Sequence, residues 1–381
     1  MNIKKICLIG ISFLSLFIKT SVFAAPIPVE KLQLPPGFEV SVYASGLETP
    51  RQMALADNGV VFVGSMHDKV YALEPSTDLK KAQKIDVIAK NLNYPNGVAF
   101  RDGTLYVAEI QKISAYQDIL NHLNQPLLPK IVSTALPDKT WHGFRYIKFG
   151  PDGWLYMGIG MPCNTCIQED KRFGTLSRIS LQQPEKLEVF ARGLRNSVGF
   201  AWDPDDKSLW FTDNGQDLLG DKLPPEELNR ASKADINFGF PFFYGNNVPA
   251  PHYDGLNAPK EATPPALELP AHMAPLGMTF YTGHTFPADY HDVIFIALHG
   301  SWNRSTKVGY KVIRVNHQGE KVIGYETFMS GWLEKNEQVW GRPVDVLVMP
   351  DGALLISDDM SGVIYRVSYK EPQLNKKEGA K

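Results

Sequence analysis

The sequence predicts an all-β fold: a six-bladed β-propeller with a long loop insertion between the fourth and fifth repeats. Three observations support this prediction: a turn-and-strand pattern that occurs six times, strands that are apolar at consecutive positions, and a repeat spacing near the length of a four-stranded blade. Helical periodicity is weak over comparable windows. With 44% hydrophobic and 11% aromatic residues among 381, the chain can also bury a sizeable core.

Each copy of the repeat is a turn rich in Asp and Gly followed by a short strand. The copies read ALADNGVVFVGS, AFRDGTLYVAE, KFGPDGWLYMGIG, AWDPDDKSLWFTDNG, FPADYHDVIFIALHG and VMPDGALLISDD. In the middle of the strand they place Phe62, Tyr106, Tyr156, Trp210, Phe295 and Leu355, at intervals of 44, 50, 54, 85 and 60 residues. Six blades of roughly 55 to 60 residues would therefore account for nearly all of the mature chain.

The local chemistry of each copy agrees with a propeller blade. Strands that are apolar at consecutive positions are buried on both faces, as in sheets packed face to face around an axis. Asp-Gly between two such strands favours a tight hairpin, because the turn requires positive φ. The segment FEVSVYASG (38–46) is also strand-like. We expect it to pair beside GVIYRVSY in the last blade and to close the ring.

The chain divides into a leader, one folded domain and a tail. Residues 1–24 combine Lys4 and Lys5 with an apolar run over 6–18 and small residues up to Ala24, which is typical of a secretory signal peptide. That apolar run is too short to span a bilayer comfortably. We therefore expect an exported protein, periplasmic or secreted, with no membrane span in its mature form.

The folded domain is predicted over 25–370. Within it, residues 216–275 form the loop-rich insertion, whose part 246–272 carries six prolines. Long loops of this kind are usually functional covers or disordered spans. Residues 371–381 are predicted to be a polar tail.

Charge and cysteine content narrow the possible partners. Removal of residues 1–24 takes away Lys4, Lys5 and Lys19 and no acids, so the net charge of −2 becomes −2 − 3 = −5. Nucleic acid is therefore not an expected partner. In an oxidising compartment the remaining Cys163 and Cys166 most simply form a disulfide, and their context favours a loop staple over a redox centre.

The predicted fold brings polar loops together at one mouth of the central channel. In an antiparallel blade, the loop entering the first strand and the loop leaving the second lie on the face opposite the Asp-Gly hairpin. The entering loops contain Arg51, Gln52, Asn96, His142, Arg195, Asn196, Leu276 and Arg342. The leaving loops contain Glu109, 161–166, 213–217, 299–304, Asp358 and Asp359. A ring containing Arg51, Arg195, Arg304 and Arg342 indicates a small polyanionic ligand, because the guanidinium fork suits planar carboxylates.

Each of these residues also has a structural interpretation. A histidine before a strand can be a packed or capped residue, although convergence with arginines favours a functional His142. Arg195 and Arg342 can instead form salt bridges within the rim. For Asp358 and Asp359 the sequence favours turn formation over a role in the site.

At these residues the chain resembles the soluble quinoprotein sugar dehydrogenases, most closely the sorbosone dehydrogenase branch. The resemblance runs through most of the mature chain. It rests on WHGFRYIKFGPDGWLYMGIG, ARGLRNSVGFAWDP, TDNGQD followed by EELNRASKADINFGFP, ALHGSWNR, and GRPVDVLVMPDG, in that order and spacing. It implies a six-bladed propeller that binds pyrroloquinoline quinone (PQQ) and calcium.

Position by position, the resemblance implies roles for individual residues. His142 occupies the place of the family's catalytic histidine, and Arg195 and Asn196 that of its quinone-contacting pair. Arg342 is similar to a cofactor arginine of the last blade, and we place the converging Asn96 with the cofactor residues. For the family's cofactor lysine, which has no clean match here, our choice is Arg304, with His299 and Lys307 as rivals.

The resemblance also implies a metal site. Gly215 and Gln216 are similar to the loop whose backbone carbonyls hold calcium. Many relatives have proline at the second position, so Gln216 is a departure, although a carbonyl ligand does not depend on the side chain.

The expected chemistry follows from the residue types. PQQ has three carboxylates and an ortho-quinone that accepts hydride, while calcium prefers oxygen ligands and acts as a Lewis acid. A neutral His142 would act as general base on a sugar hemiacetal or aldehyde hydrate. The expected substrate is a small sugar or sugar aldehyde of the aldose or sorbosone type, and electrons would pass to an external acceptor.

Two other functions fit the same fold. The first is a calcium-dependent propeller lactonase, whose metal is usually held by several Asp, Glu and Asn side chains; the dominance of arginine in this ring favours an organic anion instead. The second is a non-enzymatic propeller that binds a glycan or a protein, which the fold alone does not exclude.

Overall fold

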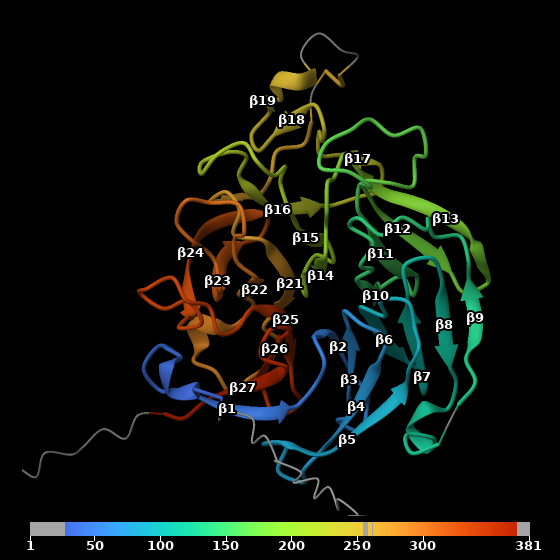
Figure 1. Cartoon of the computed structure of the whole chain (residues 1–381), viewed down its shortest axis with the longest axis vertical. Helices are drawn as coiled ribbons and strands as arrows, with labels where there is room; N and C mark the ends of the chain where they lie inside the picture. The colour runs from blue at the N-terminus through green and yellow to red at the C-terminus, as the bar shows by residue number, and fades with distance from the viewer. Residues whose placement is uncertain (1–26, 126, 254–257, 261, 372–381) are drawn as a thin grey trace, which may run out of the picture.

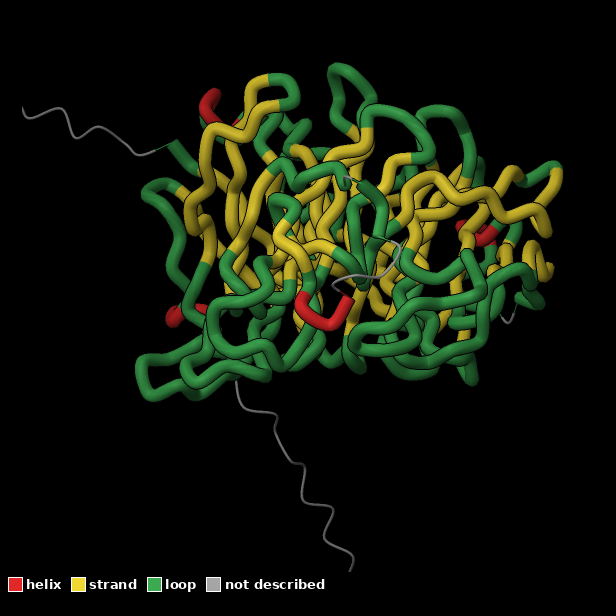
Figure 2. The backbone as a smooth tube through the Cα atoms, turned by 90° about the horizontal axis from the view of Figure 1, so that it is seen from above, coloured by secondary structure: helices red, strands yellow, loops and turns green. Residues whose placement is uncertain are grey.

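Six β-sheets surround one central axis in the computed structural model, which describes residues 27–125, 127–253, 258–260 and 262–371 (Figure 1). The prediction of an all-β, six-bladed propeller is therefore confirmed. Seen from the side, the strands form a layer between two layers of loops (Figure 2). The predicted signal peptide (1–24) lies outside the described residues, as does the predicted tail from residue 372 onward.

The first three blades follow one another along the chain, each with its innermost strand first. Blade one consists of β2 (Pro50–Leu55), β3 (Val61–Ser65), β4 (Val70–Pro75) and β5 (Ala82–Ala89). Blade two consists of β6 (Gly97–Arg101), β7 (Thr104–Ala108), β8 (Ile113–Tyr116) and β9 (Lys130–Ser133). Blade three consists of β10 (Ile147–Phe149), β11 (Leu155–Ile159), β12 (Thr175–Ser180) and β13 (Gln183–Arg192).

The last three blades complete the ring. Blade four consists of β14 (Gly199–Trp202), β15 (Leu209–Asp213), β16 (Glu226–Ala231) and β20 (Leu267–Leu269). Blade five consists of β21 (Pro275–Phe280), β22 (Ile294–Leu298), β23 (Lys311–Gln318) and β24 (Lys321–Met329). Blade six consists of β25 (Pro343–Val348), β26 (Leu354–Asp358), β27 (Val363–Tyr369) and β1 (Phe38–Ser45). The only helical turns in the described ranges are short 3-10 segments: η1 (Val29–Lys31), η2 (Ile119–Asn121), η3 (Pro251–Tyr253) and η4 (Ala288–Tyr290).

The ring is closed by pairing between the two ends of the folded domain. Strand β1 runs antiparallel to β27, from Phe38 opposite Tyr369 to Ser45 opposite Val363. This is the pairing that the sequence predicts for 38–46. Because β1 is the outermost strand of blade six, the N-terminal part of the domain completes the blade that the C-terminal strands begin, and the ring is closed at its outer edge.

The predicted column of large residues forms the contact between neighbouring blades. Phe62, Trp210 and Phe295 are fully buried, each in a different hydrophobic cluster between two sheets. Tyr106 is only partly buried. Face-to-face packing of sheets therefore accounts for strands that are apolar at consecutive positions.

The inner strands approach one another so closely that some positions require glycine. An added Cβ on Gly97 would collide with the carbonyl oxygen of Arg145, and one on Gly199 with the carbonyl of Leu276. Both contacts join the inner strand of one blade to the segment that begins the inner strand of the next. Glycine at these positions permits the narrow axis.

Three inner strands begin with proline and then a β-bulge, in which two residues face one on the partner strand. The bulges lie after Pro50 in β2, after Pro275 in β21 and after Pro343 in β25. A bulge re-aims side chains that the ladder would otherwise place on the sheet faces. The bulged residues include Arg51 and Asp345, whose side chains contact other blades near the axis.

The predicted insertion is less separate from the blades than the sequence indicates. Residues 216–275 contain both outer strands of blade four, β16 and β20. They also contain β17 (Ile236–Asn237), which adds to blade three in parallel with β13, and a small hairpin of β18 (Phe243–Tyr244) and β19 (Val248–Pro249). Apart from these strands, the 3-10 turn η3 and the first residue of β21, the described residues of the segment are loop, as expected.

Candidate active site

Polar side chains from different blades join in one chain of hydrogen bonds at the predicted mouth of the channel. Asp359, after β26, accepts from Arg51 Nη1 at 2.7 Å, and Arg51 Nε donates to Asn96 Oδ1 at 2.9 Å. Asn96 Nδ2 then donates to the Arg145 carbonyl at 2.8 Å, and Arg145 Nη1 to the His142 carbonyl at 3.5 Å. Convergence of the loops of blades six, one, two and three, as the repeat predicts, is therefore observed.

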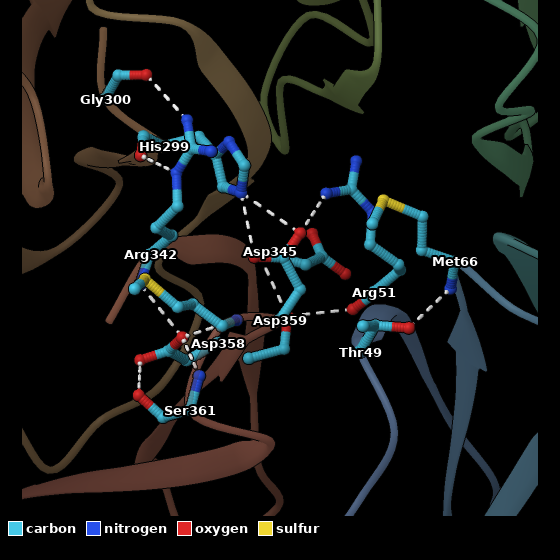
Figure 3. Close-up of polar contacts among 12 residues, drawn as sticks. Thr49, Arg51, Met66, His299, Gly300, Arg342, Asp345, Asp358, Asp359 and Ser361 are labelled. Atoms are coloured by element: carbon cyan, nitrogen blue, oxygen red, sulfur yellow. Dashed lines mark hydrogen bonds and ion pairs between the residues drawn. The ribbon is translucent and has the colours of Figure 1, made fainter. Parts of the chain in front are cut away.

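One part of this mouth is a group of charged residues that we call the arginine cluster: Arg51, His299, Arg342 and Asp359 (Figure 3). The Asp359 carboxylate lies between Arg51 and His299, whose Nε2 is 2.9 and 3.0 Å from its two oxygens. Arg342 donates from Nε to the His299 carbonyl at 3.0 Å and from Nη2 to the Gly300 carbonyl at 2.8 Å. Three blades contribute to the cluster.

The charges in the arginine cluster determine its ionisation. Burial alone would raise the pKa of Asp359, but its contacts with His299 and Arg51 outweigh burial and hold that pKa well below the usual range. Burial lowers the pKa of His299, and the neighbouring Arg342 and Arg51 lower it further against the opposing effect of Asp359. The cluster thus contains one ionised carboxylate and two guanidinium groups.

Donors remain available on both arginines. Arg51 uses only Nε and one bond of Nη1, while Arg342 uses Nε and one bond of Nη2, in the hydrogen bonds to described residues. A guanidinium carries more N–H donors than these contacts use. The unused N–H groups of the arginine cluster can therefore donate hydrogen bonds to an external carboxylate while the contacts within the cluster are kept.

The other part of the mouth is what we call the histidine cluster: Trp141, His142, Met161, Arg195 and Asn196. His142 Nδ1 lies 2.8 Å from the Met161 carbonyl, so this nitrogen carries the proton and Nε2 holds the lone pair. The imidazole has an indole donor on the other side, because Trp141 Nε1 is 3.1 Å from Nε2. Burial lowers the pKa of His142 to about 3, with a further contribution from Arg195. His142 is therefore a neutral base at physiological pH.

Close packing fixes the position of His142. Its φ is 50°, in the left-handed region that is uncommon for residues other than glycine. A Cβ added to Gly160 would lie 2.5 Å from the His142 Cβ and 2.9 Å from Asn196 Oδ1. His142 and Asn196 are thus neighbours across Gly160, and the Asn196 amide makes no hydrogen bond to another described side chain.

Arg195 differs from the arginines of the other cluster because its donors are nearly all used internally. It bonds to the Asn164 carbonyl at 2.8 Å, to Asn164 Oδ1 at 2.9 Å, to the Asn214 carbonyl at 3.2 Å and to Asp217 Oδ2 at 2.6 Å. The structural alternative of a rim salt bridge therefore describes Arg195 in this state. Arg195 orients the surrounding loops and supplies positive charge beside His142.

The cysteine pair supports this arrangement. Cys163 and Cys166 are joined in a disulfide, as the sequence predicts. The short loop between them presents Asn164, which bonds Arg195 and accepts the Asp217 N–H at 2.9 Å. The disulfide therefore constrains the loop that carries Asn164, and Asn164 in turn holds Arg195.

A buried carboxyl supports the histidine cluster. Its loop, 213–217, is one of the predicted leaving loops, but the sequence predicts no role for the carboxyl itself. Asp213, at the end of β15, accepts from the backbone N–H of Arg195 and Asn196 at 2.9 and 2.8 Å and from Ser197 Oγ at 2.7 Å. Burial raises its pKa to about 6 against the lowering effect of these hydrogen bonds. Asp213 thus fixes the backbone that carries the predicted cofactor pair.

The predicted calcium loop has carbonyls free to bind a metal. Neither the Gly215 nor the Gln216 carbonyl accepts a hydrogen bond from another described residue. The Gly215 N–H is held by Glu226 Oε2 at 2.7 Å, and the Gln216 side chain by the Tyr244 hydroxyl at 2.6 Å. These contacts anchor the loop through its other groups. Side chains alone provide no such site, since no group of three or more His, Cys, Asp or Glu in the described ranges is arranged to hold a metal.

Two predicted cofactor residues are engaged elsewhere. Asn96 is buried, and its side-chain amide is engaged within the protein. The amide oxygen accepts a hydrogen bond from Arg51, and the amide nitrogen donates one to the Arg145 carbonyl. Arg304 Nη1 bonds to the carbonyls of Asp221 at 2.6 Å and Ala271 at 3.1 Å and joins neither cluster by a hydrogen bond in the described chain. Of the two rivals to Arg304, Lys307 Nζ bonds to the Glu337 carbonyl, whereas His299 belongs to the arginine cluster. The roles of Asn96 and Arg304 stay predictions.

The two neighbouring aspartates after β26 behave differently. Asp358 accepts from the backbone N–H of Arg342, Met360 and Ser361, so it shapes a turn as the sequence favours. Asp359 instead forms the ion pair with Arg51, although the sequence favours a turn for it as well. Its partner lies 308 residues away, so no local pattern could have identified it.

Comparison with known proteins identifies chains that are similar to this one. A family model described as TrAA12-like matches residues 226–370. An uncharacterized protein of Borreliella burgdorferi is 37% identical over 356 residues, which cover 89% of this chain and 91% of that protein. The pyrroloquinoline quinone-dependent pyranose dehydrogenase of Coprinopsis cinerea is 31% identical over 125 residues, which cover 27% of this chain and 16% of that protein.

Solved structures share the fold. The holo form of the PQQ domain of the Coprinopsis cinerea pyranose dehydrogenase superimposes with a TM-score of 0.73 at 19% identity, covering 88% of this chain and 97% of that one. A calcium structure of the Trichoderma reesei carbohydrate-active enzyme of family AA12 gives a TM-score of 0.74 at 19% identity, covering 89% and 97%. In the described residues no helix is long and apolar enough to cross a membrane.

Proposed function

Because the chain belongs to the soluble PQQ-dependent sugar dehydrogenase-like family, we propose that it oxidises a sugar or sugar aldehyde with PQQ and calcium as cofactors. The proposed substrate is a small molecule of the aldose or sorbosone type, and the proposed electron acceptor is an external one. The predicted signal peptide supports a periplasmic or secreted location for this activity.

One observation carries the proposal: a neutral, well-oriented imidazole lies at the same channel mouth as two guanidinium groups with unused donors. A histidine with its proton on Nδ1 can accept a proton only at Nε2. Free donors on Arg51 and Arg342 match the carboxylates of a planar organic acid. An acid of that kind and a proton acceptor are the two components that a quinone-dependent oxidation requires.

The described residues fit PQQ and calcium. The arginine cluster would hold carboxylates of the cofactor, and the Asn196 amide is free to bind a further polar group. The Gly215 and Gln216 carbonyls would be oxygen ligands of a calcium ion, which is the ligand type that calcium prefers. When bound, the quinone accepts hydride and the metal acts on it as a Lewis acid.

The main contribution of the protein's own residues to the proposed reaction is proton transfer by His142. The Met161 carbonyl fixes the tautomer, and Gly160 and the left-handed backbone fix the position of the ring. Nε2 would take the proton from the hydroxyl group of a hemiacetal or aldehyde hydrate as hydride leaves its carbon. Arg195 beside the ring disfavours a charged imidazolium, so the proton would pass on to solvent.

Reconstitution tests this proposal. The purified protein would be incubated with PQQ and calcium together, with each alone and with neither, and offered a panel of aldoses with a redox dye. We expect dye reduction only when both cofactors are present. Calorimetry would report PQQ binding separately. Proton release from lactones without PQQ would support the lactonase alternative, and binding of a glycan without turnover would support a binding function.

A further inference from the structure

The lone pair of the proposed general base is covered by a neighbouring side chain. Trp141 Nε1 lies 3.1 Å from His142 Nε2, and an indole nitrogen can only donate. The other ring nitrogen is committed to the Met161 carbonyl at 2.8 Å. The one atom of the imidazole that could accept a substrate proton is therefore already accepting a hydrogen bond from the protein.

The two partners of this hydrogen bond differ in how firmly they are held. His142 is confined by its left-handed backbone and by the close approach of Gly160. Trp141 is 55% exposed, an unusual position for the largest apolar side chain, and its indole N–H has no other acceptor in the described residues. Movement of the indole would cost little buried surface, whereas movement of the imidazole would disrupt the mouth.

We propose that Trp141 is a displaceable latch on His142: its indole N–H occupies Nε2 until a substrate hydroxyl takes its place. This inference rests on the proposed function, in which Nε2 accepts the substrate proton. Trp141 is then a positioning residue that acts through His142. The latch keeps the lone pair directed at the mouth, and it makes each substrate compete with an internal donor.

The strength of a neutral hydrogen bond sets the size of the effect. A bond of this kind contributes modestly in water, so its loss should change a competing equilibrium by about 2- to 12-fold. The latch is therefore weak enough for a substrate hydroxyl to displace and strong enough to measure. Removal of the indole N–H should make Nε2 more reactive and should tighten substrate binding.

Carbethoxylation of histidines by diethyl pyrocarbonate tests the latch without any cofactor. The reagent attacks an unprotonated imidazole nitrogen, and peptide mass mapping would give the rate at His142, with the exposed His291 as internal reference. In Trp141→Phe, which keeps the bulk and removes the N–H, we expect His142 to react about 2- to 12-fold faster. Trp302→Phe is the matched control, because Trp302 is also exposed, at 69%, but bonds to no histidine in the described chain. Equal rates at His142 in the wild type and in Trp141→Phe would overturn the proposal.

Kinetics of the reconstituted enzyme supply a second measurement. Trp141→Phe should lower KM for the sugar by about 2- to 12-fold and leave kcat within about twofold, since competition for Nε2 is removed. A raised KM in this variant would contradict the latch. If reconstitution yields no sugar oxidation while the carbethoxylation rate still rises, the proposed function fails and the contact between Trp141 and His142 stands.

Discussion

The arginine cluster and the histidine cluster use the same residue type in opposite ways. Arg195 in the histidine cluster makes four hydrogen bonds to its own loops, whereas Arg51 and Arg342 in the arginine cluster keep donors free. A guanidinium whose N–H donors are nearly all bonded within the protein supplies charge and rigidity, whereas one with unused donors can also bind a ligand. The difference indicates that one part of the mouth holds an anion while the other holds a base in place.

The largest expected effect separates binding from turnover. His142→Ala should keep PQQ affinity and lose roughly 10²- to 10⁴-fold in kcat, because general-base catalysis contributes about that much. Arg342→Ala should instead weaken PQQ binding by roughly 10-fold or more, since a charge-assisted hydrogen bond is lost. Calorimetric titration with PQQ and steady-state dye reduction would measure the two quantities. Unchanged activity in His142→Ala would remove His142 from the mechanism.

The next effect concerns the buried ion pair of the arginine cluster. Asp359→Ala leaves Arg51, which is 5% exposed, without its carboxylate, and breaking a buried pair costs about 3 to 5 kcal/mol of unfolding free energy. The pair of Asp289 and Arg314 is the control. Asp289 is exposed and Arg314 keeps Glu326 as a second partner, so Asp289→Ala should cost at most ~1 kcal/mol. Urea unfolding would measure both. Similar losses in the two variants would mean that Asp359 does not stabilise Arg51 as described.

A smaller effect depends on pH and contrasts two aspartates of blade six. Burial raises the pKa of Asp345 to about 6, against hydrogen bonds from Met53 and Val346, whereas the pKa of Asp359 is depressed. When folding raises the pKa of a carboxyl, the protonated group contributes stability that is fully present below a pH of about 4. This contribution is lost as the pH rises through about 6. Asp345→Asn should therefore remove a pH-dependent loss on the order of 3 kcal/mol between pH 4 and 7.

The sign of this effect is the test. Unfolding of wild type and Asp345→Asn would be compared at pH 4 and pH 7, and the asparagine variant should gain relative stability at the higher pH. For Asp359 the sign is opposite, because stability from a depressed carboxyl is present at pH 7 and is lost as pH falls. If Asp345→Asn were stabilised relative to the wild type at pH 4 rather than at pH 7, the result would contradict the raised pKa of Asp345.

The smallest effect is expected from removal of the disulfide between Cys163 and Cys166, in the loop that contacts Arg195. The double change of Cys163→Ser with Cys166→Ser opens a loop of few residues, so the loss of unfolding free energy should be roughly 2 kcal/mol or less. The histidine cluster should respond more than the arginine cluster, because Asn164 in that loop holds Arg195. We expect PQQ affinity to stay within about threefold while kcat falls more. A larger change in PQQ affinity than in kcat would reverse the assignment of the two clusters.

The sequence predicts the repeat well because its signals are local. Phe62, Trp210 and Phe295 each follow a turn that contains aspartate, and burial on both faces follows from their neighbours in the same strand. Pairing of 38–46 with the last strand follows from the need to close a ring. Segment 216–275 was harder to predict, since β20 is only three residues long and β17 joins a blade that precedes it in the chain.

The clusters themselves were only partly predictable. Convergence of His142, Arg195 and Arg342 follows from rotational symmetry, which places equivalent loops at one mouth. The partners of these residues do not follow, because Asp359 meets Arg51 from 308 residues away. The bulges that aim Arg51 and Asp345 follow a proline at the start of the strand, but that proline does not say which residue the side chain will contact. Trp141 was missed for another reason: its contact is with the adjacent residue and depends on the positive φ of His142.

The pairing of β1 with β27 also bears on how a newly made chain can fold. During synthesis the ribosome releases β1 first and β27 last, so blade six stays incomplete until nearly the whole polypeptide has emerged. Until then the edges of β26 and β1 are unpaired and open to association with other chains. The finished ring, and with it the mouth where the two clusters meet, can therefore form only after translation has passed the final strand.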